Sequence, residues 1–352
     1  MAEAIVKVIN QKKKESKLDF LTKSDFSPKA NYLFDMGSIS VTEHCDLSCV
    51  FCHFNGPKAV KKFESLKKEY AFKAINELKP KTQLYFAATG ELFLDPNAEL
   101  YIKTALDKDL DVLILTHGQA MDNFRIDRLL NIGLRKFRFS CDAIDHKTYS
   151  KIRRGGDFQK ILVACEYLRN KKIKFPDINV EINATLLSNT FKNKNQFILF
   201  WKNKVDGLNF NAEYYDIFKY RNIHYLPKKR VDCNIQTYLL PSGRIAPCCA
   251  MIVYSHENDV SWLPHIKDHS LIDAHKILSQ MYEDKSSKLG NLCKNCDWWI
   301  MWSRENNRTP YLECHNFNNN IFNKKTKKKL FINYLIRIFR KIINFILQKN
   351  DG

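Results

Sequence analysis

Six predicted strands alternate with helices between residues 37 and 220, and this alternation limits the possible folds more than any other feature. Strands connected through helices run parallel with right-handed crossovers. The sequence therefore predicts an α/β fold, a partial (β/α)6 TIM-like barrel with functional side chains at the carboxyl ends of its strands. The predicted strands are 37–43, 83–88, 111–116, 136–141, 178–186 and 207–212, and the predicted helices are 66–78, 98–106, 123–132, 158–170 and 195–203.

Four segments are expected along the chain of 352 residues, of which 45% are hydrophobic. Residues 1–36 are a polar lead-in, and residues 37–220 form the partial barrel. Residues 221–315 form a small C-terminal cluster-binding extension. Residues 316–352 contain a C-terminal amphipathic helix that follows a run of lysines.

Three cysteines follow the first predicted strand as Cys45, Cys49 and Cys52. Four thiolates close a 4Fe–4S cluster, whereas three leave one iron with a position open for a small molecule. Zinc and single-iron sites also use cysteines two residues apart, so the triplet alone does not fix the metal.

This spacing, with Phe51 before the last cysteine, resembles the radical S-adenosylmethionine (SAM) superfamily. The resemblance implies that the open iron of a 4Fe–4S cluster binds the amino and carboxylate groups of SAM. It also implies that the reduced cluster cleaves SAM to a 5′-deoxyadenosyl radical. A flavodoxin or reductase would then be the electron-donating partner.

A Thr89-Gly90-Glu91 sequence follows the second predicted strand and resembles the Gly-Gly-Glu element that holds the amino group of SAM in this superfamily. Thr89 stands where the first glycine is usual. A glycine permits close approach of a ligand, and a carboxylate can accept hydrogen bonds from an ammonium group. Glu91 is therefore expected to bind that group.

Further SAM contacts are expected at the ends of the later strands. The stretch from Ser140 to Phe158 resembles radical SAM enzymes of the SPASM and twitch groups, in which a serine and a following arginine contact the SAM carboxylate. Either Arg153 or Arg154 would supply the bidentate guanidinium. Asn183 would reach the nucleoside or fill the barrel. His117 stands where related enzymes usually have asparagine, and it would either line the pocket or pack.

A second set of cysteines, Cys233, Cys248, Cys293 and Cys296, provides four thiolates. The segment 240–248 reads as a β-hairpin, and this half of the chain resembles the twitch form of the SPASM extension. That form carries one auxiliary 4Fe–4S cluster. A zinc ribbon is the alternative, because structural zinc uses the same four ligands.

Cys249 follows a predicted ligand and has two interpretations. A free thiol beside the active site would donate a hydrogen atom to a substrate radical, as in radical SAM epimerases, or it would only pack. Cys141 and Cys165 are expected in the core.

The formal net charge of +19 is concentrated in part in the last 29 residues. The basic excess there lies in an apolar helix rather than in an Arg/aromatic patch, which argues against nucleic acid. Residues 324–349 are expected either to contact an anionic membrane peripherally or to dock on the fold. Eleven cysteines without a signal peptide indicate a cytoplasmic protein, peripheral at the inner membrane face if the tail binds lipid.

The predicted activity is that of a radical SAM oxidoreductase that removes hydrogen from a substrate C–H bond. By analogy, the substrate is a small molecule or glycan, and the reaction oxidises a sugar or cyclitol alcohol. Radical epimerisation with Cys249 as donor, peptide maturation and a non-catalytic iron–sulfur electron carrier are the alternatives.

Overall fold

The computed structural model describes residues 36–57, 59, 63–86, 89–186, 194–212, 235–294, 296 and 312–316. They all lie in a compact unit of the chain that begins at Phe34. Cys233 and the tail at 324–349 lie outside the described residues, so the expectations for them stay predictions.

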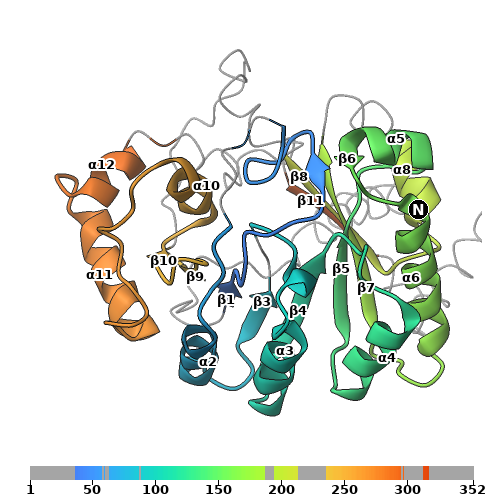
Figure 1. Ribbon diagram of the computed structural model, residues 1–352, viewed down its shortest axis with the longest axis horizontal. Helices are drawn as coiled ribbons and strands as arrows, with labels where there is room; N and C mark the ends of the chain where they lie inside the picture. The colour runs from blue at the N-terminus through green and yellow to red at the C-terminus, as the bar shows by residue number, and fades with distance from the viewer. Residues whose placement is uncertain are drawn as a thin grey trace, which may run out of the picture. The chain divides into compact units, whose positions relative to one another are not determined.

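A sheet of nine strands forms the centre of the described part of the chain (Figure 1). In spatial order the strands are β10 (Ile245–Ala246), β9 (Thr237–Leu239), β1 (Met36–Ile39), β3 (Gln83–Phe86), β4 (Asp111–Thr116), β5 (Lys136–Ser140), β7 (Asn179–Leu186), β8 (Gly207–Ala212) and β11 (Leu312–Asn316).

The six strands predicted for the barrel are all present. They are parallel and adjacent in chain order from β1 to β8. The outermost strands, β10 and β11, pair antiparallel with their neighbours and leave the sheet open among the described residues. The prediction of an α/β fold with a partial barrel is therefore confirmed.

Helices connect these strands (Figure 1), and five of them lie at the predicted places, whereas the helices at 146–152, 249–257, 271–283 and 288–294 were not predicted. Three of the helices begin at an aspartate whose side chain accepts a backbone N–H of the first turn, as preferred at helix N-termini. The helices are α2 (Lys68–Glu77), α3 (Ala98–Asp107), α4 (Asn123–Asn131), α5 (His146–Ile152), α6 (Phe158–Lys171), α8 (Lys194–Trp201), α10 (Cys249–Glu257), α11 (Leu271–Glu283) and α12 (Lys288–Lys294). None of the described helices has the length and apolar character needed to cross a membrane.

The first strand is shorter than predicted. β1 ends at Ile39, and the following residues pair with a loop instead of extending the sheet. Thr42 forms an isolated bridge with Ser65, and the N–H of Glu43 donates to the carbonyl of Glu64. The chain thus leaves the sheet before it reaches the cysteines.

The predicted hairpin is confirmed as β9 and β10, with Gly243 at a φ of +80° in its turn. β9 pairs parallel with β1, and β11 pairs antiparallel with β8. Segments expected in the C-terminal extension therefore lengthen the barrel sheet at both edges. Strands of two to five residues carry too little pattern to predict such pairings.

The two faces of the sheet differ in chemistry because alternate side chains point to opposite faces. Phe137 and Phe139 of β5 are fully buried, whereas Arg138 between them is half-buried. We call the face that carries Arg138 the inner face. The polar side chains on it include Tyr85, Arg138, Glu181 and Asn209. The inner face is thus not filled by the branched apolar residues that are usual in a closed barrel.

Candidate functional site

The three N-terminal cysteines lie in a loop that is tied to a distant part of the chain. Within the loop, β2 (Ser48–Cys49) pairs antiparallel with β6 (Arg153–Arg154), and Cys49 lies opposite Arg153. The N–H of Val50 also donates to the carbonyl of Ile152 at 2.9 Å. The loop is therefore held against the end of α5.

Each of the three thiols has an N–H donor close to it. The backbone N–H of Leu47 donates to the thiol of Cys45, and that of Asn55 lies 3.3 Å from the sulfur of Cys52. The third donor, Nη1 of Arg153, lies 3.8 Å from the sulfur of Cys49. Hydrogen bonds of this kind to cysteine sulfurs are typical of iron–sulfur sites. The donor set thus fits a cluster held by the three thiolates.

Burial disfavours the charged form of two of the three thiols. Burial raises the pKa of Cys45 to about 12 and that of Cys49 to about 11. A charge on Cys49 would raise the pKa of Cys45, and one on Cys52 would raise that of Cys49, so the sulfurs lie near one another. Coordination would replace each proton by iron.

Glu91 lies buried between the cysteine loop and β4. Its Oε1 accepts a hydrogen bond from Oγ1 of Thr116 at 2.6 Å, and its Oε2 accepts the backbone N–H of His117 at 2.9 Å. Its own N–H donates to the carbonyl of His44, beside Cys45, at 2.7 Å. The carboxylate predicted to bind the amino group of SAM is thus fixed next to the cysteine loop.

Thr89 and Gly90 pack against the residues that lead from β1 into the cysteine loop. Thr89 Oγ1 lies 3.1 Å from Oγ of Ser40, which follows β1. A Cβ atom on Gly90 would lie 2.3 Å from the carbonyl oxygen of His44. The close approach that requires glycine is therefore to the backbone of the cysteine loop, and sequence reasoning had assigned it to a ligand.

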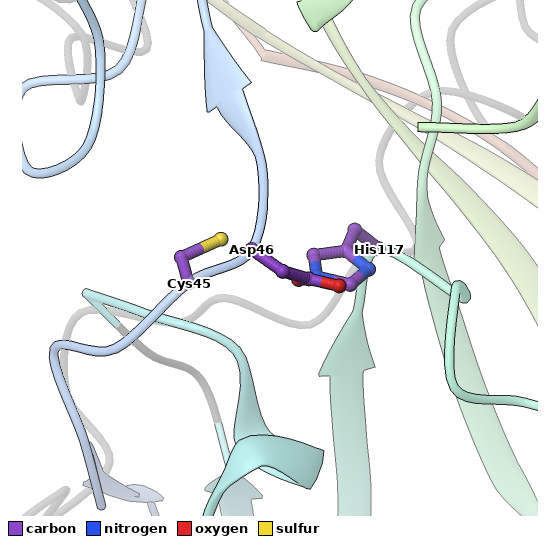
Figure 2. Close-up of side chains that lie close together, drawn as sticks. All are labelled: Cys45, Asp46 and His117. Atoms are coloured by element: carbon purple, nitrogen blue, oxygen red, sulfur yellow. The ribbon is translucent and has the colours of Figure 1, made fainter. Parts of the chain in front are cut away.

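His117 connects the cysteine loop to the end of β4 (Figure 2). Its ring lies beside Asp46, and ligand atoms of Cys45, Asp46 and His117 all lie within 4.8 Å of one another. Nδ1 accepts the N–H of Gln119 at 3.2 Å, so Nε2 carries the proton and donates to Oδ1 of Asp46 at 2.7 Å. This hydrogen bond lowers the pKa of Asp46.

The sequence left the role of His117 open. The only signal for it was the histidine at a position where related enzymes usually have asparagine. Asp46 carried no signal at all, because its partner lies 71 residues away in the sequence.

The two arginines proposed for the SAM carboxylate have different environments. Arg153 is 6% exposed, and its Nε donates to Oδ2 of Asp142 at 2.6 Å. Arg154 is exposed. Ser140 and Asn183 lie opposite each other in the register of β5 and β7, and both are half-buried. The structure thus places Ser140 next to Asn183, and of the two candidate arginines it places Arg153 beside the cysteines.

Three of the four predicted auxiliary ligands are described, and their thiols lie near one another. Burial raises the pKa of Cys248, and the thiols of Cys249, Cys293 and Cys296 raise it further. The N–H of Cys296 donates to the carbonyl of Cys293 at 3.3 Å. Cys249, the first residue of α10, is half-buried in the same group. Cys141 and Cys165 are buried, as expected for core residues.

A cavity of about 760 Å³ lies between Glu43, Thr89, the β9–β10 turn and the end of α10. His256 in its wall is 2% exposed, and its Nδ1 lies 3.7 Å from Oε1 of Glu43. The lining is rich in carboxylates and hydroxyls and contains one arginine. These polar residues are Glu43, Glu64, Thr89, Ser242, Arg244, Ser255, His256, Glu257, Asn258, Asp259 and Ser261.

The inner face of the sheet carries a second group of polar contacts. Nε of Arg138 donates to Oε2 of Glu181 at 2.8 Å, and Asn209 donates to the same oxygen at 2.8 Å. Asn179 donates to Oε1 of Glu181 at 2.9 Å. Burial raises the pKa of Glu181, but Arg138 and these amides outweigh it, so the net shift is downward.

Comparison with known proteins agrees with this geometry. Residues 39–190 match the model of the Radical SAM superfamily. A GTP 3′,8-cyclase of Campylobacter jejuni is 28% identical over 174 residues, which cover 47% of this chain and 49% of that protein. One from Clostridium botulinum is 26% identical over 165 residues, covering 45% and 48%. The chain thus spans about half the length of the curated relatives it matches.

Solved structures with the same fold include anSMEcpe with bound AdoMet, at a TM-score of 0.53 and 16% identity. That match covers 88% of this chain and 99% of anSMEcpe. Streptococcus suis SuiB bound to the precursor peptide SuiA has a TM-score of 0.52 and 12% identity, covering 69% and 64%. At these identities the likeness concerns the fold alone.

Proposed function

Because residues 39–190 are a radical SAM domain, we propose that this enzyme uses SAM to remove a hydrogen atom from a substrate alcohol carbon and oxidises a sugar or cyclitol. The observation that supports this most is the position of Glu91. Its buried carboxylate accepts the backbone N–H of His117, whose ring contacts Asp46, and the N–H of Glu91 donates to the carbonyl of His44 in the cysteine loop. A SAM ammonium on Glu91 would therefore lie beside a cluster on these cysteines.

The residues of the site have distinct tasks in this proposal. Cys45, Cys49 and Cys52 would hold the site cluster, Glu91 would bind the amino group of SAM, and Ser140 would face its carboxylate. When bound, the reduced cluster supplies the electron that cleaves SAM to methionine and a 5′-deoxyadenosyl radical. Thr116 and the backbone of His117 keep Glu91 in one orientation, because they occupy both of its oxygens.

The proposed oxidation removes two hydrogen atoms' worth of protons and electrons from the substrate alcohol, in two steps. Loss of one hydrogen atom from the carbinol carbon to the 5′-deoxyadenosyl radical gives 5′-deoxyadenosine. Loss of one proton and one electron from the remaining substrate radical then gives a carbonyl group. An auxiliary cluster on Cys233, Cys248, Cys293 and Cys296, when bound, would supply the acceptor for that electron.

A polar substrate is supported by the surroundings of the site. The cavity beside Thr89 offers carboxylates and hydroxyls next to Leu240, Pro241 and Val260, and the inner face near Ser140 offers Arg138, Glu181 and amide side chains. Such groups recognise the hydroxyls of a sugar or cyclitol through hydrogen bonds, and a hydrophobic molecule would leave them unpaired.

The test is anaerobic reconstitution followed by incubation with SAM, dithionite and a panel of sugars and cyclitols. We expect 5′-deoxyadenosine, with a carbonyl product in equal amount for the true substrate. Cys45→Ala should abolish both, whereas Cys165→Ala removes a core thiol outside the site and should retain both. Absence of 5′-deoxyadenosine from the reconstituted protein would support the electron-carrier alternative.

Radical epimerisation is the second candidate, supported by the half-buried thiol of Cys249 among the auxiliary cysteines. An epimerase would return a hydrogen atom to the substrate radical, so its product would contain no new carbonyl. Cys249→Ala should then leave SAM cleavage intact and stop product formation. A carbonyl product that persists in Cys249→Ala would exclude the donor role.

A further inference from the structure

The guanidinium of Arg153 is enclosed by the cysteine loop and by an acidic partner. Nε donates to Asp142 at 2.6 Å, and the guanidinium carbon lies 5.3 Å from the centre of the Phe51 ring. The other oxygen of Asp142 accepts the backbone N–H of Thr185 at 2.5 Å. The ion pair is therefore fixed to β7 on one side and to the cysteine loop on the other.

The same guanidinium contacts a predicted cluster ligand. Nη1 of Arg153 lies 3.8 Å from the sulfur of Cys49, and both atoms are buried. The antiparallel pairing of β2 with β6 places the two residues directly opposite each other. A backbone ladder and a buried ion pair thus keep this cation near the sulfur.

We propose that Arg153 raises the reduction potential of the site cluster through its contact with Cys49. The inference rests on the proposed function, since it takes Cys49 as a cluster ligand. Reduction adds one negative charge to the cluster, and a buried cation beside a ligand sulfur stabilises that charge. An N–H···S hydrogen bond acts in the same direction. Arg153 is thus a positioning and electrostatic residue that acts on the cluster before SAM binds.

Asp142 reduces the effect of Arg153 on the reduction potential, so replacing Asp142 should shift the potential in the opposite direction. Its carboxylate offsets part of the guanidinium charge that the cluster would experience. Removing the carboxylate charge should therefore make the cluster easier to reduce, whereas removing the guanidinium should make it harder. Arg154 provides a matched control, because it is the adjacent arginine of β6 and is exposed.

The experiment is a redox titration of the reconstituted full-length protein without SAM, followed by electron paramagnetic resonance. The signal that later changes on addition of SAM identifies the site cluster. We expect a more negative midpoint potential in Arg153→Gln and a less negative one in Asp142→Asn. Arg153→Lys should fall between wild type and Arg153→Gln, and Arg154→Gln should match wild type.

Each remaining outcome counts against the proposal. Wild-type potentials in both Arg153→Gln and Asp142→Asn would overturn it, even if SAM binds more weakly, because Arg153 would then serve only the SAM carboxylate. Shifts of both variants in the same direction would also overturn it. If Arg153→Gln takes up too little iron for a titration, the potential of Asp142→Asn tests the proposal, because a potential that is not less negative than that of the wild type would overturn it. A wild-type chain that assembles no cluster at Cys45, Cys49 and Cys52 would refute the proposed function as well.

Discussion

The Nε2 proton of His117 bonds to the carboxylate of Asp46 at 2.7 Å, and this contact joins the cysteine loop to the end of β4. The backbone of His117 also holds Oε2 of Glu91. His117 therefore contacts both the loop that would hold the cluster and the carboxylate that would hold SAM.

Replacing His117 by asparagine should weaken SAM binding more than it slows turnover. The shorter side chain loses the bond to Asp46 while the backbone bond to Glu91 remains. A hydrogen bond to a charged group contributes about 1.5–3 kcal/mol, so we expect about a tenfold rise in the KM for SAM and little change in kcat. Measurement of 5′-deoxyadenosine formation against SAM concentration checks this, with the exposed His146→Asn as control. Equal KM values in the two variants would contradict the connecting role.

Replacing Gly90 by alanine should displace the cysteine loop. The new methyl group would meet backbone atoms of Thr42, Glu43 and His44, which cannot rotate away. Overpacking of this kind costs about 1–3 kcal/mol or more, so we expect a lower free energy of unfolding and reduced iron uptake.

Gly133→Ala serves as the comparison for that variant. Its φ of +104° strains a side chain, but the nearest atom to a new Cβ, on Leu106, is 3.9 Å away. It should lower stability by about 1 kcal/mol and leave iron uptake unchanged. If Gly90→Ala incorporates iron as well as Gly133→Ala does, the close packing at Gly90 does not control the loop.

Replacing both Cys293 and Cys296 by serine should remove one of two clusters. Two 4Fe–4S clusters predict about eight irons per chain in the wild type and about four in the variant. Formation of 5′-deoxyadenosine should persist, because the cysteines of the N-terminal loop are untouched. Iron and sulfide analysis checks the first expectation. Loss of zinc rather than iron in the variant would establish the zinc alternative instead.

Replacing Arg138 by methionine should destabilise the inner face in a pH-dependent way. Arg138 keeps the pKa of the half-buried Glu181 below its ordinary value. The pair therefore stabilises the fold above the ordinary pKa of glutamate, and this contribution is lost as the pH falls through the lowered pKa. Without Arg138, burial dominates and the pKa of Glu181 should rise.

We expect the Arg138→Met variant to lose about 1.5–3 kcal/mol of unfolding free energy at pH 7, the contribution of a hydrogen bond to a charged group, because two amides still bond to Glu181. The deficit should shrink as the pH falls through the raised pKa of Glu181 in the variant, because the carboxyl group then becomes neutral. Denaturant unfolding at several pH values measures it. Arg128→Met, which removes an exposed partner of Glu99, should change stability little. A deficit independent of pH would indicate lost packing rather than lost charge pairing.

The sequence by itself determined the fold class, since β4 and β8 match their predicted bounds and the other barrel strands differ by only a few residues at their ends. Strand and helix periodicity are local properties of the chain, so they can be read without knowing the tertiary structure. The same holds for the spacing of Cys45, Cys49 and Cys52, which lie within eight residues of one another.

Only the tertiary structure decided which residues support these cysteines. It buried Arg153 against Cys49 and left Arg154 exposed, although the two are adjacent in sequence and chemically identical. It brought Asp46 to His117 and Gly90 to His44, and it added β9 and β11 to the edges of the sheet. Each of these contacts joins segments far apart in the chain, and their pairing depends on how the strands are ordered in space rather than on any local pattern.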